Sequence, residues 1–220
     1  MGAVAAFIAG MLALSCAIAQ DKPAAGKLDF VEGDAIVEPK DGQARIARTG
    51  DPVYQADTIT TFAAAEVHVA MADGAELAVR ENTKVTITVY VANGDDDDRS
   101  LLDLARGTLR AVTGWIGKYR RSGYQIRTPM VTIGVRGTDH EPLVIPVGSE
   151  RGEPGTYDHV HAGAVFVRTP QGSLDIGAGQ VGFAPRGLGL PPEVLAVLPT
   201  LYQPTRNEGQ FAGLNERIKS

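Results

Sequence analysis

Hydrophobic and polar residues alternate with a period of two over short stretches of this chain. The clearest stretch is residues 85–91, where valine and isoleucine occupy the odd positions and threonine and tyrosine the even ones. Successive side chains of a strand point to opposite faces, so this pattern predicts a strand with one apolar face. Residues 66–71 and 76–79 alternate in the same way around Asp73-Gly74, which predicts a hairpin because Asp-Gly favours tight turns.

Further turn residues divide the rest of the chain into short strands. Residues 39–42 separate two apolar stretches and predict another hairpin, and Gly50-Asp51 and Asp57 predict tight corners in which the carboxylate accepts backbone N–H groups. Residues 101–104 and 107–112 predict two strand pieces around a glycine. We therefore expect an all-β fold, either a twisted β-solenoid or a β-sandwich. One short C-terminal helix is expected within residues 191–198, where prolines bracket an apolar run.

Composition limits the size and the class of the protein. The 220 residues are 44% apolar and 21% charged, which is enough to bury one core. The net charge of -5 argues against a nucleic-acid partner, since phosphate binding requires a concentrated basic face. The expected organisation is a flexible leader at residues 20–29, a β domain at residues 30–184 and a tail at residues 185–220.

Residues 1–19 predict an export signal. They are almost wholly apolar and end in Ala17-Ile18-Ala19, which fits the hydrophobic region and cleavage site of a secretory signal peptide. Retention as a membrane anchor is the alternative, because the apolar stretch is near spanning length. After cleavage no transmembrane segment is expected, and the single cysteine, Cys16, is lost, so no disulfide forms. The predicted location is periplasmic or secreted.

Residues 127–138, with the sequence RTPMVTIGVRGT, predict a buried strand with a sharp exit. The proline favours extended geometry before it, and Gly137 permits a conformation that other residues resist. Arg136 must either reach solvent or find several acceptors. We favour an arginine that ties down loop carbonyls, with ligand binding as the alternative.

This stretch resembles the signature of FecR-domain proteins, which are periplasmic sensing modules. The signature residues are Thr128, Pro129, Arg136, Gly137 and Thr138. The resemblance covers about residues 30–183, through the Gly-Asp corners, the Asp73-Gly74 hairpin and a later Gly-x-Val strand. It implies a solenoid fold, signature residues that are structural or face a partner, and binding to a protein partner in envelope signalling, in family members often linked to iron. The familiar regulators have a cytoplasmic segment and a membrane helix before this module, so we expect a stand-alone binding protein here.

His159 and His161 are the strongest candidates for metal binding. They lie two apart on a predicted strand and so face the same side. If residues 150–155 close a hairpin, residues 139–141 lie alongside, and His140, Asp139 or Glu141 comes within reach. Nitrogen and oxygen donors suit zinc, copper or ferric iron. The alternative, which we favour, is that these histidines face solvent and bind nothing.

No sequence feature indicates catalysis. The chain lacks a nucleophile elbow, a zinc-protease helix, a phosphate-binding loop and a dinucleotide fingerprint. We expect a protein that is not an enzyme, needs no cofactor and binds a protein of the cell envelope. The alternative is a module that binds glycan through the loop around Trp115, or metal through the histidine strand.

Overall fold

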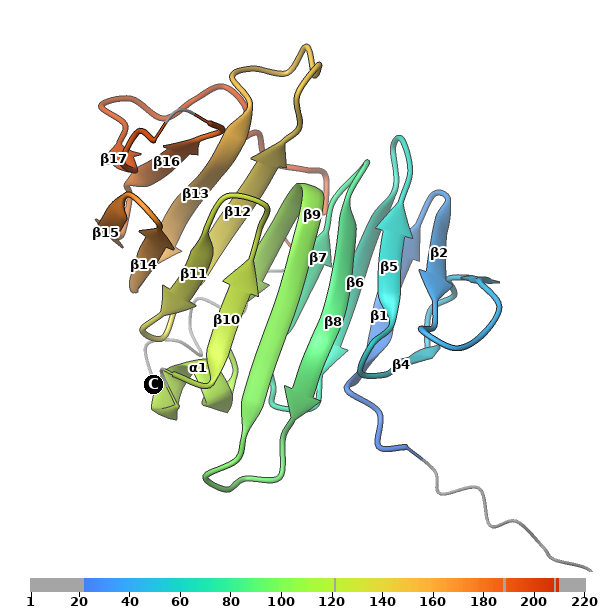
Figure 1. Cartoon of the computed structure of the whole chain (residues 1–220). Coiled ribbons are helices and arrows are strands. Elements are labelled where there is room, and N and C mark those ends of the chain that lie inside the picture. Colours follow the sequence, from blue (N-terminus) through green and yellow to red (C-terminus); the bar gives the residue numbers. More distant parts are fainter. Residues whose placement is uncertain (1–21, 121, 188, 208, 210–220) are drawn as a thin grey trace, which may run out of the picture.

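The computed structural model describes residues 22–120, 122–187, 189–207 and 209. Two β-sheets are stacked face to face, and the short helix α1 (Trp115–Tyr119) lies at one end of the stack (Figure 1). About 50% of the described residues are in strands and 3% are in the helix, and neither sheet closes into a barrel. The expected all-β class is confirmed. The signal peptide predicted for residues 1–19 lies outside the described residues.

Sheet A forms the rear layer in the view of Figure 1. Its strands, in spatial order, are β4 (Pro52–Val53), β1 (Gly26–Glu32), β6 (Glu66–Met71), β7 (Glu76–Val79), β9 (Arg99–Val112), β12 (Asp139–Ile145), β13 (Gly155–Ala162), β16 (Val181–Pro185) and β17 (Glu193–Val194). All neighbours in this sheet are antiparallel.

Sheet B forms the front layer in the same view. Its strands, in spatial order, are β3 (Arg45–Ile46), β2 (Ala35–Glu38), β5 (Thr58–Thr61), β8 (Lys84–Val91), β9, β10 (Tyr124–Arg127), β11 (Thr132–Val135), β14 (Ala164–Thr169) and β15 (Gly172–Gly177). Only the pairing of β9 with β10 is parallel in this sheet.

The chain passes repeatedly between the two sheets and advances along both in step. Strands β6 and β7 form a hairpin in sheet A, β10 and β11 one in sheet B, β12 and β13 the next in sheet A, and β14 and β15 the next in sheet B. This path produces the layered arrangement of the sandwich alternative. The hairpins predicted around residues 39–42 and Asp73-Gly74 are both present.

The fourteen-residue strand β9 belongs to both sheets. Residues 99–106 pair with β8 in sheet B, and residues 107–112 pair with β7 and β12 in sheet A. The two strand pieces predicted around Gly107 are therefore one continuous strand. Gly107 has a φ of +84°, and a Cβ there would lie 2.2 Å from Thr83 Oγ1. Only glycine fits this close approach.

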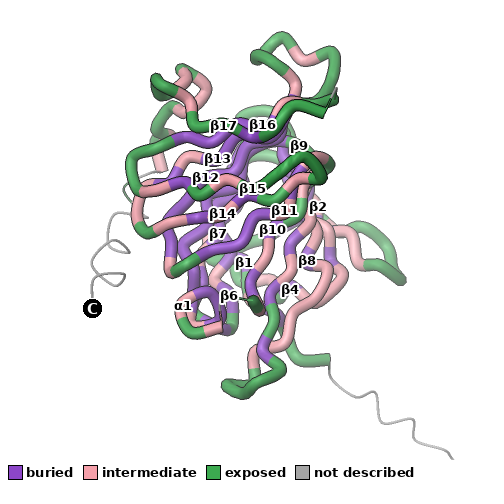
Figure 2. Tube along the Cα trace, turned by 60° about the vertical axis from the view of Figure 1, so that its left-hand side comes forward, coloured by how far each residue is buried: buried purple, intermediate pink, exposed green. Residues whose placement is uncertain are grey.

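The core fills the space between the sheets, with apolar side chains from alternate positions of each strand. In β8 the core residues are Val85 and Ile87, and in β9 they are Leu102 and Leu104 on the sheet B side and Leu109 and Ala111 on the sheet A side. In Figure 2 the buried parts of the trace run through the middle of the strands, whereas exposed parts gather in the loops. The period of two seen in the sequence is therefore the alternation between core and outer face.

Two boundary expectations differ from the structure. Strand β1 begins at Gly26, with Ala25 and Leu28 buried, so the ordered domain starts before residue 30. The helix expected within residues 191–198 is wrong, since Glu193–Val194 pairs with β16 as strand β17. Six residues between two prolines are too few to nucleate a helix, and pairing with a free strand edge satisfies the backbone instead. Among the described residues, no helix is long and apolar enough to cross a bilayer.

We predict that Gly107→Ala destabilises the fold far more than Gly179→Ala. The two glycines share a positive φ of +84° and +78°, but a Cβ at Gly179 would meet nothing within 4 Å. Gly179→Ala should cost about 1 kcal/mol for the left-handed backbone alone. Gly107→Ala should cost about 3 kcal/mol or more, because it adds the clash with Thr83. Urea unfolding of both variants measures the difference, and equal losses would contradict the close approach.

Candidate functional site

The first part of the signature, Thr128 and Pro129, forms the turn between β10 and β11. The Thr128 hydroxyl accepts hydrogen bonds from the backbone N–H groups of Met130 and Val131, at 3.2 and 3.1 Å, and lies 2.8 Å from the hydroxyl of Thr156 in the facing sheet. Pro129 is exposed. Thr128 therefore has contacts that stabilise the hairpin and join the two sheets.

The second part, Arg136 to Thr138, is the crossover from sheet B to sheet A. Gly137 has a φ of +61°, as expected of a residue that turns the chain sharply. Thr138 is fully buried, its N–H donates to the Thr113 hydroxyl at 2.9 Å, and its carbonyl accepts the Thr113 N–H at 2.9 Å. Gly137 and Thr138 are thus positioned by the backbone path.

Arg136 differs from the favoured expectation. Its side chain is exposed and forms no hydrogen bond or ion pair with any residue the structure describes, so it does not tie down loop carbonyls. The guanidinium reaches solvent instead, so its charge is neither buried nor unsolvated.

Helix α1 lies beside this crossover. The Gly137 N–H donates to the Gly117 carbonyl at 3.3 Å, and the last helical residue, Tyr119, is 81% exposed. Trp115 at the start of the helix is half-buried against the core, and its indole N–H donates to Asp98 at 2.8 Å. Trp115 is therefore a core lid and not an open platform for a sugar ring.

The outer face of sheet A carries a second group of polar side chains, which we call the charged band. Its members come from strands β6, β9, β12 and β13 and from the residue that follows β7: Glu66, His68, Arg80, Arg110, Asp139, Glu141, His159 and His161. Most are buried, which is unusual for ionisable groups unless they are paired.

Two arginines hold the charged band together. Arg110 donates two hydrogen bonds to Asp139, at 2.9 and 2.7 Å. Arg80 donates to Glu141 at 2.8 Å and lies 3.8 Å from Glu66. These contacts join side chains from strands on both sides of β9, so the band crosses the middle of the sheet.

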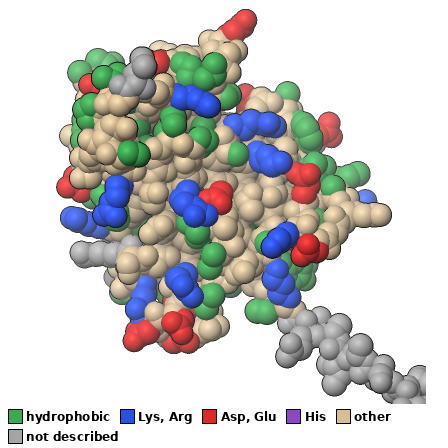
Figure 3. Space-filling model, in the orientation of Figure 1, with side chains coloured by type: hydrophobic (Ala, Val, Ile, Leu, Met, Phe, Trp, Pro, Cys, Tyr) green, Lys and Arg blue, Asp and Glu red, His purple; other side chains and the backbone are tan. Residues whose placement is uncertain are grey.

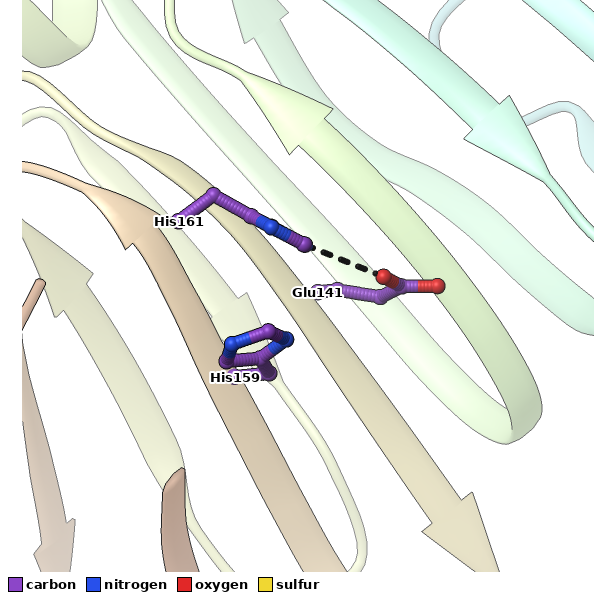
Figure 4. A group of neighbouring side chains, drawn as sticks. All are labelled: Glu141, His159 and His161. Carbon is purple, nitrogen blue, oxygen red and sulfur yellow. Dashed lines mark hydrogen bonds and ion pairs between the residues drawn. The ribbon is translucent and has the colours of Figure 1, made fainter. Parts of the chain in front are cut away.

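The structure separates the candidate histidines into two groups. His159 and His161 share the outer face with Glu141, which lies directly opposite His159 in the hairpin of β12 and β13. His161 Nε2 lies 3.1 Å from Glu141 Oε2, and the ring centroids of the two histidines are 4.2 Å apart (Figure 4). His140 faces the core instead, fully buried and 3.0 Å from Asp158. The predicted hairpin is therefore confirmed, whereas His140 lies on the wrong face to join the others.

The environment shifts the pKa values of three groups in the band. Burial raises the pKa of Glu141, but the hydrogen bond from His161 and the charge of Arg80 outweigh burial and hold the pKa below its ordinary 4.5. For Glu66, the His68 hydrogen bond and the Arg80 charge likewise outweigh burial and lower the pKa. Burial, with a smaller effect from the charge of His161, lowers the pKa of His159 below 6.5. At neutral pH the band therefore holds two carboxylates and one neutral imidazole at these positions.

The C-terminal segment covers the charged band. Leu195, Leu201 and Tyr202 pack on an apolar patch of β12, β13 and β16, Thr205 accepts a hydrogen bond from Arg80 at 2.8 Å, and Arg206 pairs with Glu32 of β1. A cavity of about 590 Å³ remains between this segment and the sheet, lined by residues that include Glu66, Arg80 and Glu141. Every residue of β12 is consequently buried on one face or the other.

Sequence reasoning missed most of the charged band. Glu66 and Arg110 occupy polar positions of alternating strands and Arg80 directly follows another strand, so the pattern predicts that all three are exposed. Glu66 and Arg80 instead contact Asn207 and Thr205, more than 120 residues away in sequence. The signal that was available is the pair of histidines two residues apart.

The face shown in Figure 3, which lies over sheet B, mixes basic and acidic side chains and has no large region of one sign. This face therefore lacks the continuous basic surface that phosphate binding requires.

We predict that Asp139→Asn costs much more stability than Asp103→Asn. Asp103 has the same bidentate contact with Arg127, at 2.7 and 3.0 Å, but that pair is partly exposed. Asp139→Asn leaves the charge of Arg110 buried and should lower the free energy of unfolding by about 3–5 kcal/mol. Asp103→Asn should cost about 1 kcal/mol or less. Comparable losses in urea titrations would show that burial does not increase the contribution of the Arg110–Asp139 pair to stability.

We also predict a two-stage loss of stability in acid. The folded pKa of His159 is lower than the unfolded value, so the unfolded state binds a proton first and stability falls as the pH drops below about 6.5. The stabilisation from Glu66 and Glu141 is present above 4.5 and is lost as the pH falls through their lowered folded pKa values.

The variant His159→Gln isolates the first stage. Its stability relative to the wild type should improve as the pH falls from 7.5 to 5.5, measured by urea unfolding at each pH. The groups that act on His159 through their charge, His161, Glu141, Asp158 and Arg110, and the Tyr202 ring that packs on it are present in both proteins. A difference that does not change with pH would refute the assignment.

The chain resembles known proteins over part of its length. No curated protein matches the chain significantly. Among solved structures it is similar to a "Cell surface anchoring domain", with 27% identity and a TM-score of 0.29, over 30% of this chain and 87% of that one. It is also similar to a "putative anti-sigma factor from Parabacteroides distasonis ATCC 8503", with 16% identity and a TM-score of 0.46, over 63% of this chain and 57% of that one. The chain thus spans little more than half of the second structure.

The chain also matches a protein-family model. The model described as "FecR protein" matches residues 57–166, which is half of the chain. The matched range runs from the corner at Asp57 through the signature to Phe166 in β14, and it includes β9, α1 and both halves of the crossover. The chain belongs to the FecR protein family.

Proposed function

We propose that this protein is a non-enzymatic sensing module of the cell envelope that binds a protein partner through the surface of α1 and the signature crossover. Membership of a regulatory family supports a signalling role. The observation that carries the choice of surface is Arg136, the one signature residue whose side chain is charged, exposed and without a contact to the described residues.

Tyr119 and Arg136 suit a protein interface. Tyrosine and arginine are enriched among residues that dominate binding energy, because they combine large contact area with directed hydrogen bonds. Both are attached to rigid backbone: α1 docks on the crossover through the Gly137 to Gly117 hydrogen bond, and Thr138 is pinned by Thr113. A surface that is already ordered loses little entropy when a partner binds.

The chemistry of this surface indicates an acidic partner segment. Lys118 and Arg120 flank Tyr119, and Arg120 pairs with Asp96 of the neighbouring loop. Arg136 adds a charge with no described counter-ion. On a protein with a net charge of -5, a local basic surface favours a partner of complementary sign.

The proposed location depends on the first nineteen residues, which lie outside the described residues. We propose that they direct export and that the module acts in the periplasm or after secretion. A link to iron and the identity of the partner are expectations from the family, and the partner surface does not depend on either.

We predict that Arg136→Ala and Tyr119→Ala each weaken partner binding at least tenfold, about 1.4 kcal/mol or more. The measurement is quantitative capture from an envelope extract, followed by titration of the captured protein. Arg48→Ala is the matched control, because Arg48 is exposed on the loop between β3 and β4. Strand β4 lies on the other side of the view in Figure 1 from α1. Equal capture by all four proteins would place the partner surface elsewhere.

A further inference from the structure

The histidines of the charged band form, with Glu141, a group of three potential metal ligands. One ligand atom from each of Glu141, His159 and His161 lies within 4.8 Å of the other two. Ligand atoms at about 2.0–2.1 Å from a tetrahedral zinc are separated by roughly 3.3 Å. Side-chain rotations that move these atoms by about an ångström would therefore let all three contact one zinc ion. Figure 4 shows the three side chains converging from two adjacent strands.

The backbone fixes this arrangement. Glu141 and His159 are direct partners across the antiparallel pair, and His161 is the next residue of β13 on the same face. Both strands are central in sheet A, with β9 on one side and β16 on the other. Ligands on rigid strands lose little entropy when an ion binds.

The surroundings also suit a metal ion. Arg80 holds Glu141 Oε1 at 2.8 Å, which leaves Oε2 directed toward His161. Such an outer contact orients the carboxylate, as second-layer hydrogen bonds do at known sites. His159 Nδ1 is buried and has no hydrogen-bond partner among the described residues.

The charge of the band does not oppose a cation. Three carboxylates, those of Glu66, Asp139 and Glu141, face the two guanidiniums of Arg80 and Arg110. One negative charge is left over among these five groups, so a divalent ion meets an environment that is slightly acidic.

We propose that Glu141, His159 and His161 form a binding site for a divalent transition-metal ion such as Zn²⁺. Two imidazoles and one carboxylate are a ligand set of zinc sites that keep a fourth position for water or another ligand. Nitrogen donors favour Zn²⁺ over Ca²⁺ and Mg²⁺, which prefer oxygen. Tyr202 of the C-terminal segment lies over the site, with its ring centroid 5.2 Å from that of His159. The site shares no residue with the proposed partner surface at Arg136 and Tyr119 and does not depend on it.

The test uses the tag-free full chain, treated with chelator and titrated with Zn²⁺ by calorimetry at pH 7.5. We expect one ion per chain, and a melting temperature that rises by about 5–10 °C when Zn²⁺ is about 100 times the dissociation constant. His159→Gln and His161→Gln should each weaken binding at least tenfold. The control His68→Gln changes a histidine on the same face outside the three ligands and should bind within twofold of the wild type.

A second measurement guards against variants that fail to fold. The chain has four histidines, so ring-nitrogen NMR of the wild-type protein can follow each one during the titration. Shifts confined to His159 and His161 would support the site, as would a parallel response to Co²⁺ and none to Mg²⁺. Absence of Zn²⁺ binding, wild-type affinity in both His159→Gln and His161→Gln, or ring shifts confined to His68 and His140 would overturn the proposal.

Discussion

One strand, β9, connects the two halves of this protein. The first part of β9 pairs with β8 in sheet B, and its second part pairs with β7 in sheet A. The later strands of the chain continue both sheets from the other edge of β9, where β10 pairs in sheet B and β12 in sheet A. The change of sheet happens at Gly107, where Thr83 comes so close that no side chain fits. The Thr83 hydroxyl accepts from the Thr108 N–H at 2.9 Å and donates to the Thr108 carbonyl at 3.1 Å, so the crossing leaves neither backbone group unpaired.

The same device recurs at the signature crossover. There the Thr113 hydroxyl accepts from the Thr138 N–H and donates to the Thr138 carbonyl, at 2.9 and 3.2 Å. In both places the hydroxyl of a buried threonine provides the backbone hydrogen bonds that a neighbouring strand would provide in the middle of a sheet. Most signature residues therefore serve to turn the backbone from one sheet to the other while its polar groups stay hydrogen-bonded. The Arg136 side chain has no part in this.

The outer face of sheet A follows from a different balance. Burying arginines and carboxylates costs several kcal/mol per ion unless each is paired, and here Arg110 with Asp139 and Arg80 with Glu141 provide those pairs. The C-terminal segment then packs on the apolar patch beside the band and contacts the band through Thr205. The two surfaces that we assign to binding are close in sequence, since β12 begins directly after Thr138 and carries Glu141, but one opens at the end of the stack and the other on the face of a sheet.

The sequence by itself determined the strands, most of the turns and the class of the fold. Alternation in residues 85–91 and the turn at Asp73-Gly74 are local features, and local backbone preferences are enough to read them. The hairpin that brings residue 141 beside His159 could also be predicted from the sequence, because the turn and the strand register depend on residues that are close along the chain.

Only the tertiary structure decided which faces are buried. It placed His140 in the core and its neighbour Glu141 on the outer face, and it buried Arg80 beside a distant C-terminal segment. It also made residues 193–194 a strand and left Arg136 in solvent. Each of these outcomes depends on a contact between residues far apart along the chain. The pattern of a strand tells which side chains share a face, but not what covers that face, and burial decides the charge and the chemistry of the groups on it.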